Sequence, residues 1–301
     1  MKKLLATIVS CFVPGRVHRH AVRDAIKYGK YKKRLETIRK IKTNNKKWRE
    51  RGEKPKYNLA VCAIMKNEGP YLKEWVEYHK MVGVEKFYLY DNESNDDTKK
   101  ILSPYIKSGL IEYIFRPGQK QQIPAYKDCV EKHKFEARWI AFIDLDEYII
   151  PVKHEKITQF LDGISDRVGE IIIDWAIYGS SGHETKPRGL VLENYVWRAK
   201  KSWLYKSIIN PRLQVDYMSC HDHDVIGRVI HVSPNIMRVN HYHCKSWEEY
   251  QKRATRGDAY DGSAAGLRKY QRATFDRHDI NEIRDEIALK YVKKLKDIIK
   301  K

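Results

Sequence analysis

A run of apolar residues that ends in acids is the stretch of this chain best suited to chemistry. Residues 138–148 read RWIAFIDLDEY, and the apolar part, 140–143, is typical of a strand buried on both faces of a parallel sheet. The acids that follow would lie at the carboxyl edge of that sheet, where open α/β sheets bind ligands. Asp144 and Asp146 stand two residues apart, so both could hold one cation. A divalent cation there would neutralise the charge of a leaving group such as a nucleoside diphosphate.

Two histidines in the C-terminal half are candidates for binding the same cation. In an extended segment His241 and His243 point to the same side, and a neutral imidazole beside a carboxylate suits manganese. We predict that His241 is the ligand, although a histidine on a strand is also often a hydrogen-bonded core residue. The run His-Asp-His-Asp at 221–224 could hold a second ion, or it could form a loop at the rim of the site or a plain turn.

Aromatic residues around a glycine-rich loop could form a platform for a sugar acceptor. An aromatic face packs on a sugar ring while nearby polar groups orient its hydroxyls, and Trp175, Tyr178 and His183 have these properties. Trp175 is explained equally well as an ordinary core residue. Gly179 and Gly182 flank two serines, so the backbone of this loop could approach a ligand closely.

Strands that alternate with helices should position these residues. Apolar runs at 58–64, 86–90 and 111–115 predict strands, and helices are predicted from about Tyr71 and over 123–133. This alternation indicates an α/β fold with a mostly parallel sheet and right-handed crossovers. Asp91 follows the second strand, at a strand tip where a base or ribose would be held, whereas the rest of its loop could simply cap the next helix.

Composition favours one catalytic domain with terminal extensions. The chain has 301 residues, of which 42% are hydrophobic, and this is enough to bury an α/β core. It carries 59 lysines and arginines against 39 acids, and the net charge of +20 favours an anionic partner. The five cysteines are scattered without a Cys-x-x-Cys pair, so we expect them to be reduced and mostly buried, as in a cytoplasmic protein.

The two ends of the chain differ from the part between them. Residues 1–56 contain a short apolar helical pattern and a long basic tract, and the apolar part is shorter than the ~20 residues that span a bilayer. We predict a basic amphipathic extension that lies on the anionic, cytoplasmic face of the cell membrane; the alternatives are a solvated helix packed on the domain and an RNA-binding arm. A catalytic domain should occupy 57–275, and an amphipathic helix should occupy 276–301 after a capping box at 279–282.

Six strings of this sequence, in order between residues 58 and 258, resemble glycosyltransferase family 92 and the related family 2-like bacterial enzymes. The basic N-terminus suggests a bacterial member. The strings are AVCAIMKNE (60–68), YDNESNDDT (90–98), FIDLDEY (142–148), WAIYGSSGH (175–183), KSIINP (206–211) and HYHCKS (241–246).

The resemblance implies a GT-A fold, a mixed and mostly parallel sheet flanked by helices that binds a nucleotide-sugar donor and a divalent metal, Mn²⁺ or Mg²⁺. The donor-binding residues that it implies are Lys66, Asn67, Asp91, Asp144 and Lys245. The metal ligands that it implies are Asp144, Asp146 and His241. Transfer would proceed with inversion at the anomeric carbon.

An inverting transfer also needs a general base that takes the proton of the acceptor hydroxyl. The candidates are Glu184, Asp222 and Asp224, because the sequence lacks a clear Glu-Asp pair after the Asp-x-Asp. The expected activity is transfer of a hexose from a UDP-sugar to a glycan or lipid-linked acceptor, in cell-surface polysaccharide or lipopolysaccharide synthesis. The alternatives are a basic nucleic-acid-binding protein, for which no RNP string, helix-turn-helix or zinc-finger spacing is found, and a metal-dependent nucleotidyltransferase.

Overall fold

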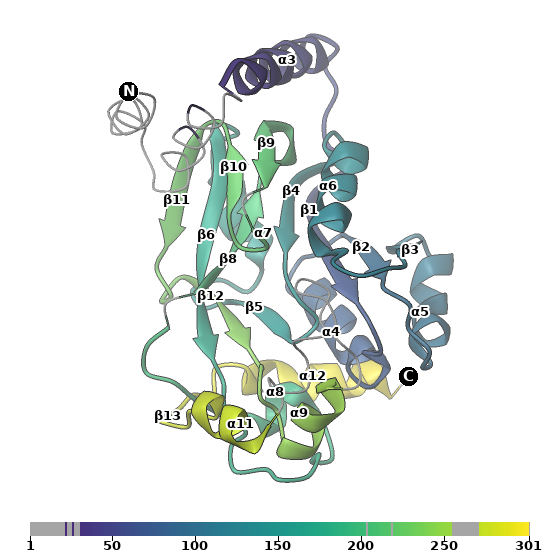
Figure 1. Cartoon of the computed structure of the whole chain (residues 1–301), viewed down its shortest axis with the longest axis vertical. Helices are drawn as coiled ribbons and strands as arrows, with labels where there is room; N and C mark the ends of the chain where they lie inside the picture. Colours follow the sequence, from purple (N-terminus) through teal and green to yellow (C-terminus); the bar gives the residue numbers. More distant parts are fainter. Residues whose placement is uncertain are drawn as a thin grey trace.

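A computed structural model describes residues 22, 26, 31–202, 204–217, 219–254 and 271–300 of the chain (Figure 1). The helices are α3 (Tyr31–Glu50), α4 (Gly69–Met81), α5 (Thr98–Lys107), α6 (Gln122–His133), α7 (Ile157–Asp162), α8 (Val191–Asn194), η1 (Pro211–Leu213), α9 (Trp247–Ala254), α11 (Arg272–His278) and α12 (Leu289–Ile299). The strands are β1 (Tyr57–Met65), β2 (Lys86–Asp91), β3 (Ile111–Phe115), β4 (Ala137–Phe142), β5 (Glu147–Pro151), β6 (Val168–Ile177), β7 (Trp197–Arg198), β8 (Tyr205–Ile209), β9 (Gln214–Tyr217), β10 (His223–Val225), β11 (Arg228–Val232), β12 (Met237–His241) and β13 (Ile283–Arg284).

A nine-stranded sheet organises the described chain, in the order β3-β2-β1-β4-β8-β6-β12-β5, with β11 also paired to β6. Strands β3, β2, β1 and β4 are parallel, whereas β8 runs antiparallel between β4 and β6, and β5 runs antiparallel to β12. The prediction of an α/β fold with a mixed, mostly parallel sheet flanked by helices is confirmed.

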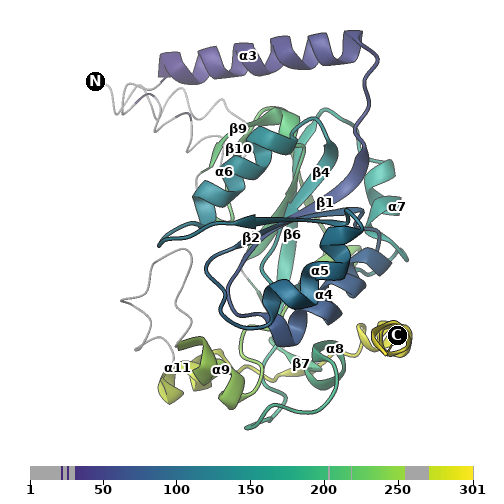
Figure 2. The ribbon, with the colours of Figure 1, turned by 90° about the vertical axis from the view of Figure 1, so that its right-hand side faces the viewer.

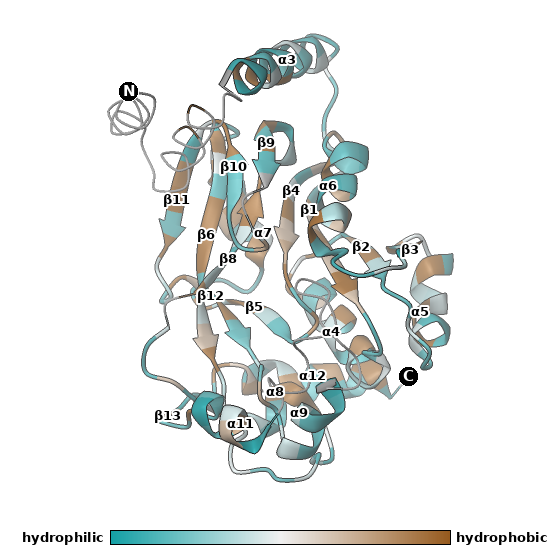
Figure 3. Cartoon of the chain, in the orientation of Figure 1, coloured by the Kyte–Doolittle hydropathy of each residue, from teal (hydrophilic) through white to brown (hydrophobic). Residues whose placement is uncertain are grey.

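Alternate residues of each central strand enter two different cores. Val61 and Ala141 face the core that α4 and α5 cover, and Cys62 and Phe142 face the core that α6 covers. Figure 2 shows α6 on one side of the strands and α4 with α5 on the other. Because both of their faces are buried, β1 and β4 are apolar over most of their length, and they are largely brown in Figure 3.

Helix α3 turns its apolar stripe toward the domain. Trp48 is buried, stacks on Phe135 at 5.9 Å between ring centroids and lies under the guanidinium of Arg212. Arg34 forms a two-point ion pair with Asp224, at 3.0 and 2.6 Å. The exposed side of α3 is basic: Lys32, Lys33, Arg39, Lys40, Lys42, Lys46, Lys47 and Arg49 are exposed. No helix in the described part of the chain is long and apolar enough to cross a membrane, and the predicted apolar segment near the N-terminus lies outside the described residues.

The C-terminal helix begins later than the sequence pattern predicts. The backbone N–H groups of Glu282 and Asp285 donate to the carbonyls of Arg198 and Val196, so residues 283–284 form strand β13 against β7. Helix α12 therefore starts at Leu289, and the predicted capping box is wrong.

A turn at Gly227 separates β10 from β11. Gly227 has a φ of +101°, and a Cβ atom there would lie 2.4 Å from the carbonyl oxygen of Arg167. The chain therefore turns between β10 and β11. The four described cysteines are free and three of them are buried; Cys11 lies outside the described residues.

A buried carboxyl on β6 should make stability depend on pH. Burial raises the pKa of Glu170 from 4.5 to about 7, while the hydroxyl of Ser207, which donates to Glu170 at 2.6 Å, opposes the shift. A raised folded-state pKa gives stability that is complete below the unfolded-state pKa and is lost as the pH rises through about 7. We expect this carboxyl to cost the protein about 3 kcal/mol between pH 4.5 and 7, and Glu170→Gln to remove that dependence.

Urea unfolding at pH 5 and pH 8 measures this effect. The control is Glu155→Gln, at an exposed carboxylate, which should keep the pH dependence of the wild type. An unchanged difference between the two pH values in Glu170→Gln would show that the group titrates normally in the folded protein.

Candidate functional site

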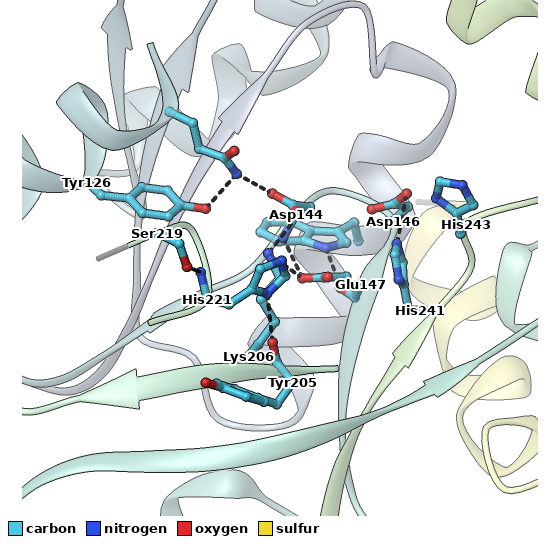
Figure 4. Close-up of polar contacts among 12 residues, drawn as sticks. Tyr126, Asp144, Asp146, Glu147, Tyr205, Lys206, Ser219, His221, His241 and His243 are labelled. Carbon is cyan, nitrogen blue, oxygen red and sulfur yellow. Dashed lines mark hydrogen bonds and ion pairs between the residues drawn. The ribbon is translucent and has the colours of Figure 1, made fainter. Parts of the chain in front are cut away.

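The Asp-x-Asp sequence lies in the loop that joins the end of β4 to β5. Strand β12 pairs with β5 so that His241 is opposite Glu147, and the N–H of Tyr242 donates to the carbonyl of Asp146 at 2.8 Å. This pairing places Nε2 of His241 3.4 Å from Oδ2 of Asp146, although the two residues are far apart in the sequence (Figure 4). The sequence-based prediction that Asp146 and His241 share one site is therefore consistent with the geometry.

His243 joins this pair to form a group that could hold a metal. Ligand atoms of Asp146, His241 and His243 lie within 4.8 Å of one another. Nδ1 of His241 is buried and has no hydrogen-bond partner among the described residues. One carboxylate and two imidazoles are a donor set that manganese accepts. The residues present therefore fit the divalent metal that the sequence predicts, with His243 as an additional ligand.

Arginine 253 supplies the counter-charge to Asp146. The Arg253 Nη2 atom, from α9, donates to Oδ2 of Asp146 at 2.6 Å, and the aspartate side chain is 11% exposed. Burial alone would raise the pKa of Asp146, but Arg253 and then His241 outweigh burial and hold that pKa well below its usual range. Burial, with Arg253, lowers the pKa of His243, so this imidazole is neutral and able to donate a lone pair to a metal.

Asp144 belongs to a neighbouring cluster around a buried lysine. Nζ of Lys206 lies 2.7 Å from Oδ2 of Asp144 and 3.5 Å from Oε2 of Glu147, and Gln122 donates to the other oxygen of Asp144 at 3.0 Å. Burial by itself lowers the pKa of Lys206, but Asp144 and Glu147 outweigh it and raise that pKa well above its usual range. Both oxygens of Asp144 are thus occupied, and Asp144 is not part of the group formed with His241 and His243.

Three of the predicted donor-binding residues, Lys66, Asn67 and Asp91, lie at the carboxyl ends of β1 and β2. Asp91 is buried, and its two oxygens accept hydrogen bonds from the backbone of Ser94 and the hydroxyl of Tyr113, so it orders its own loop. Asn67 has a φ of +52° and accepts from the N–H of Asn95 at 2.8 Å, which joins the loops after the two strands.

Lys66 follows β1 and is half-buried, and Lys245 lies deeper. Nζ of Lys245 is 3.6 Å from the centre of the Tyr71 ring. Burial lowers the pKa of Lys245 to about 8, and its charge acts on Asp146. A buried cation at this position could contact an anionic part of the donor.

Two of the three predicted bases form ion pairs with arginines. Glu184 is exposed and accepts two hydrogen bonds from Arg272, at 2.7 and 2.9 Å. Asp224 is buried in its ion pair with Arg34 and holds α3 in place, so it is a structural residue rather than a base. Asp222 accepts from the hydroxyls of Tyr205 and Ser219.

Of the three predicted acceptor residues, Trp175 lies in the site, whereas Tyr178 does not. The ring of Trp175 lies 4.1 Å from the ring of His241 and 5.3 Å from that of His221, at the centre of the site. Tyr178 is fully buried, and Arg238 and Asn240 donate to its hydroxyl, so it is a core residue rather than part of an acceptor platform. His183 is half-buried and packs edge-on against Tyr195.

Sequence reasoning missed Arg253, Lys206 and Glu147 as residues of the site. Lys206 is the first residue of KSIINP, one of the strings that carry the family resemblance, and Glu147 directly follows the Asp-x-Asp. Both positions therefore marked them as candidate site residues. Arg253 lies on a helix with other charged residues, where nothing in the local pattern distinguishes it.

A family model described as Glycosyltransferase family 92 matches residues 57–290. A family 92 protein of Oryza sativa subsp. japonica is 27% identical over 215 residues, which cover 69% of this chain and 36% of the relative. A family 92 protein of Ricinus communis is 29% identical over 212 residues, which cover 67% of this chain and 38% of the relative. A β-1,4-galactosyltransferase of Caenorhabditis elegans is 27% identical over 123 residues, which cover 36% of this chain and 29% of the relative.

These relatives come from plants and a nematode and give no support to the expected bacterial origin. The chain spans little more than a third of the length of the two plant relatives, at 36% and 38%. Among solved structures, S. aureus TarS 1–349 in complex with UDP is similar with a TM-score of 0.41 and 14% identity, over 73% of this chain and 71% of that one. This similarity is too weak to bear on function.

Proposed function

Because the chain belongs to glycosyltransferase family 92, we propose that it moves a hexose from a nucleotide-sugar donor, a UDP-sugar, to a glycan or lipid-linked acceptor. The observation that carries this proposal is the group formed by Asp146, His241 and His243 at the carboxyl edge of the sheet. Curated relatives named as galactosyltransferases support a hexose as the transferred sugar. We propose a GT-A architecture on the same basis, since the mixed sheet carries the Asp-x-Asp where that fold needs it.

The residues in and around this group would have different roles in the transfer. Asp146, His241 and His243 would hold Mn²⁺ or Mg²⁺, which when bound neutralises charge on the leaving diphosphate. Lys206 orients Asp144 beside the group through its 2.7 Å contact, so that Asp144 would meet the donor. Lys245 adds a buried positive charge next to Asp146. Trp175 forms an apolar wall against His241.

Inversion requires a base on the acceptor side, and Asp222 is the candidate that we propose. It is partly exposed and accepts from the hydroxyl of Tyr205, whose backbone carbonyl accepts from Nδ1–H of His221 at 2.8 Å. The ring of His221 packs in turn on Trp175, so Asp222 is linked to the wall of the site.

Thermal stabilisation by nucleotide sugars tests the proposed donor. A ligand that binds only the folded protein raises its melting temperature. We expect at least one of UDP-galactose, UDP-glucose and UDP-N-acetylglucosamine to do so in the presence of Mn²⁺, and to release UDP when an acceptor is added. If only nucleoside triphosphates stabilise the protein, and pyrophosphate is released, the nucleotidyltransferase alternative is correct.

His243→Gln tests the metal group without an activity assay. Loss of an imidazole ligand should weaken Mn²⁺ binding by at least the ~10- to 100-fold that loss of an outer-shell partner costs, measured by the free Mn²⁺ signal in electron paramagnetic resonance. His231→Gln is a matched control, because His231 also lies beside a carboxylate, Asp174 at 2.6 Å, but is exposed. Equal Mn²⁺ affinity in His243→Gln and the control would remove His243 from the ligand set.

We also propose that the protein is cytoplasmic and binds an anionic membrane surface peripherally, with no nucleic-acid partner. The exposed basic side of α3 supports this proposal, since each lysine or arginine near an anionic surface contributes about 1 kcal/mol. Flotation with vesicles that contain phosphatidylglycerol should recover the protein, and this recovery should fall as salt is raised.

A further inference from the structure

A cavity lies between α3 and the domain, at the opposite end of α6 from the site described above. Gln122 at the start of α6 contacts Asp144, whereas the C-terminal half of α6 forms one wall of this cavity, and α3 forms another. η1 and β9 close the remaining sides. The cavity has a volume of about 380 Å³, within the range of small-molecule sites.

Positive charge exceeds negative charge around this cavity. Four cations line it, namely Lys40, Lys127, Lys134 and Arg212, against the two carboxylates of Glu131 and Asp216. Lys127 is paired with Asp216 at 3.1 Å. The remaining lining groups thus carry a net positive charge that a bound anion would balance.

Arg212 is the buried member of this set. The residue is 7% exposed, and its Nη2 atom has no hydrogen-bond partner in the described ranges; a carboxylate oxygen of Asp166 lies 3.9 Å away. Its guanidinium lies over the ring of Trp48 at 4.7 Å, and Nε donates to Asn210 at 3.1 Å, so the group is fixed in place. The Asp166 carboxylate is too far from Nη2 for a hydrogen bond, so this donor can still meet a bound anion.

The other lining groups indicate what surrounds the anion. Gln214 is 9% exposed, and its Oε1 is an acceptor without a partner in the part of the chain that is described. Ile41, Val130 and Phe135 add an apolar wall. We propose that this cavity is a binding site for a phosphate ester of a hydroxylated molecule, with Arg212, Lys134 and Lys40 on the phosphate and Gln214 on a hydroxyl group.

Such a ligand would tie α3 to the catalytic domain. Lys40 comes from α3 and Lys134 from the segment after α6, so a phosphate between them bridges parts of the chain that otherwise meet through Trp48, Asn45 and Arg34. Binding should therefore slow hydrogen exchange of the α3 amides, because opening of α3 would require release of the ligand. The phosphate could belong to a soluble ester or to a lipid headgroup, which offer the same chemistry.

Binding of glycerol phosphate and of phosphatidate vesicles to the full chain tests the proposal. We expect one of the two to bind, with slower exchange in α3, and we expect Lys40→Glu and Lys134→Glu each to weaken binding about tenfold, which corresponds to 1.4 kcal/mol. Binding of glycerol phosphate identifies a soluble ester. Binding of phosphatidate vesicles without binding of glycerol phosphate, weakened more by Lys134→Glu than by Lys42→Glu, identifies a headgroup.

Lys42→Glu is the matched control, because Lys42 is exposed on the same helix and does not line the cavity. It should leave binding of glycerol phosphate unchanged and reduce vesicle binding less than Lys40→Glu does. Equal losses of binding in Lys42→Glu and Lys40→Glu would show a diffuse charge attraction and would overturn the proposal that the cavity is the binding site. Failure of the wild type to bind either probe would overturn it as well, and neither result depends on sugar transfer.

Discussion

Asp146→Asn should lower the transfer rate by on the order of 100- to 1,000-fold, as loss of one group that stabilises developing charge does in other enzymes. The carboxylate lies 3.4 Å from His241, in the group with His243 that we propose to hold the metal. An amide keeps the shape but loses the charge that attracts a divalent cation. Turnover and Mn²⁺ affinity, measured on the same preparation, should both fall.

The substitution also leaves Arg253 without its ion pair, so stability needs a control. Asp285→Asn is matched, since Asp285 is also 11% exposed and accepts from two arginines, Arg198 and Arg238, at 2.6 and 2.7 Å. Both variants should unfold at lower urea concentration than the wild type, but only Asp146→Asn should lose activity per folded molecule. Wild-type turnover in Asp146→Asn would refute the role of this carboxylate.

Lys206→Met should destabilise the protein by about 3 to 5 kcal/mol, the effect of removing one partner from a buried ion pair. Lys206 is 1% exposed and is the cation next to Asp144 and Glu147. Methionine preserves most of the side-chain volume, so the loss comes from charge rather than from a cavity. The midpoint and slope of urea unfolding measure this loss of stability.

A double-mutant cycle with Asp144→Asn separates the pair from its surroundings. In the Asp144→Asn background, Lys206→Met should lower the free energy of unfolding by less than it does in the wild type. The difference between the two losses is the coupling energy of the two residues. Lys132→Met is the exposed control, because its ion pair with Asp128 at 2.9 Å lies on the surface and should contribute less than about 1 kcal/mol. Additive effects in the cycle would show that Lys206 acts through other neighbours.

The local pattern of apolar and polar residues was sufficient to predict the strands and helices between β1 and β4. The predicted strand 111–115 coincides with β3, and the predicted helix 123–133 differs from α6 by one residue. Continuous apolar runs between polar loops leave little ambiguity when both faces of a strand are buried. The expectation that Asp146 and His241 share a site came instead from the family resemblance and from the alternation of side chains in an extended segment.

Residues whose roles depend on distant partners could not be predicted in this way. Tyr178 precedes a glycine-rich loop, but the side chains that bury it, Arg238 and Asn240, come from β12. Asp224 looks like a site carboxylate until Arg34, 190 positions earlier in the sequence, pairs with it. Helix α12 starts late because residues 283–284 pair with β7 as strand β13, and nothing in the local sequence predicts that pairing.

The order of strands has a consequence for synthesis on the ribosome. When residues 1–151 have emerged, β1 to β5 are present, but β8, β6 and β12, which separate β4 from β5 in the finished sheet, have not been made. The nascent polypeptide must keep one edge of β4 open, with apolar faces ready to aggregate, until residues 205–209 follow. Chaperones that recognise unpaired strand edges should therefore bind this chain during that interval of translation.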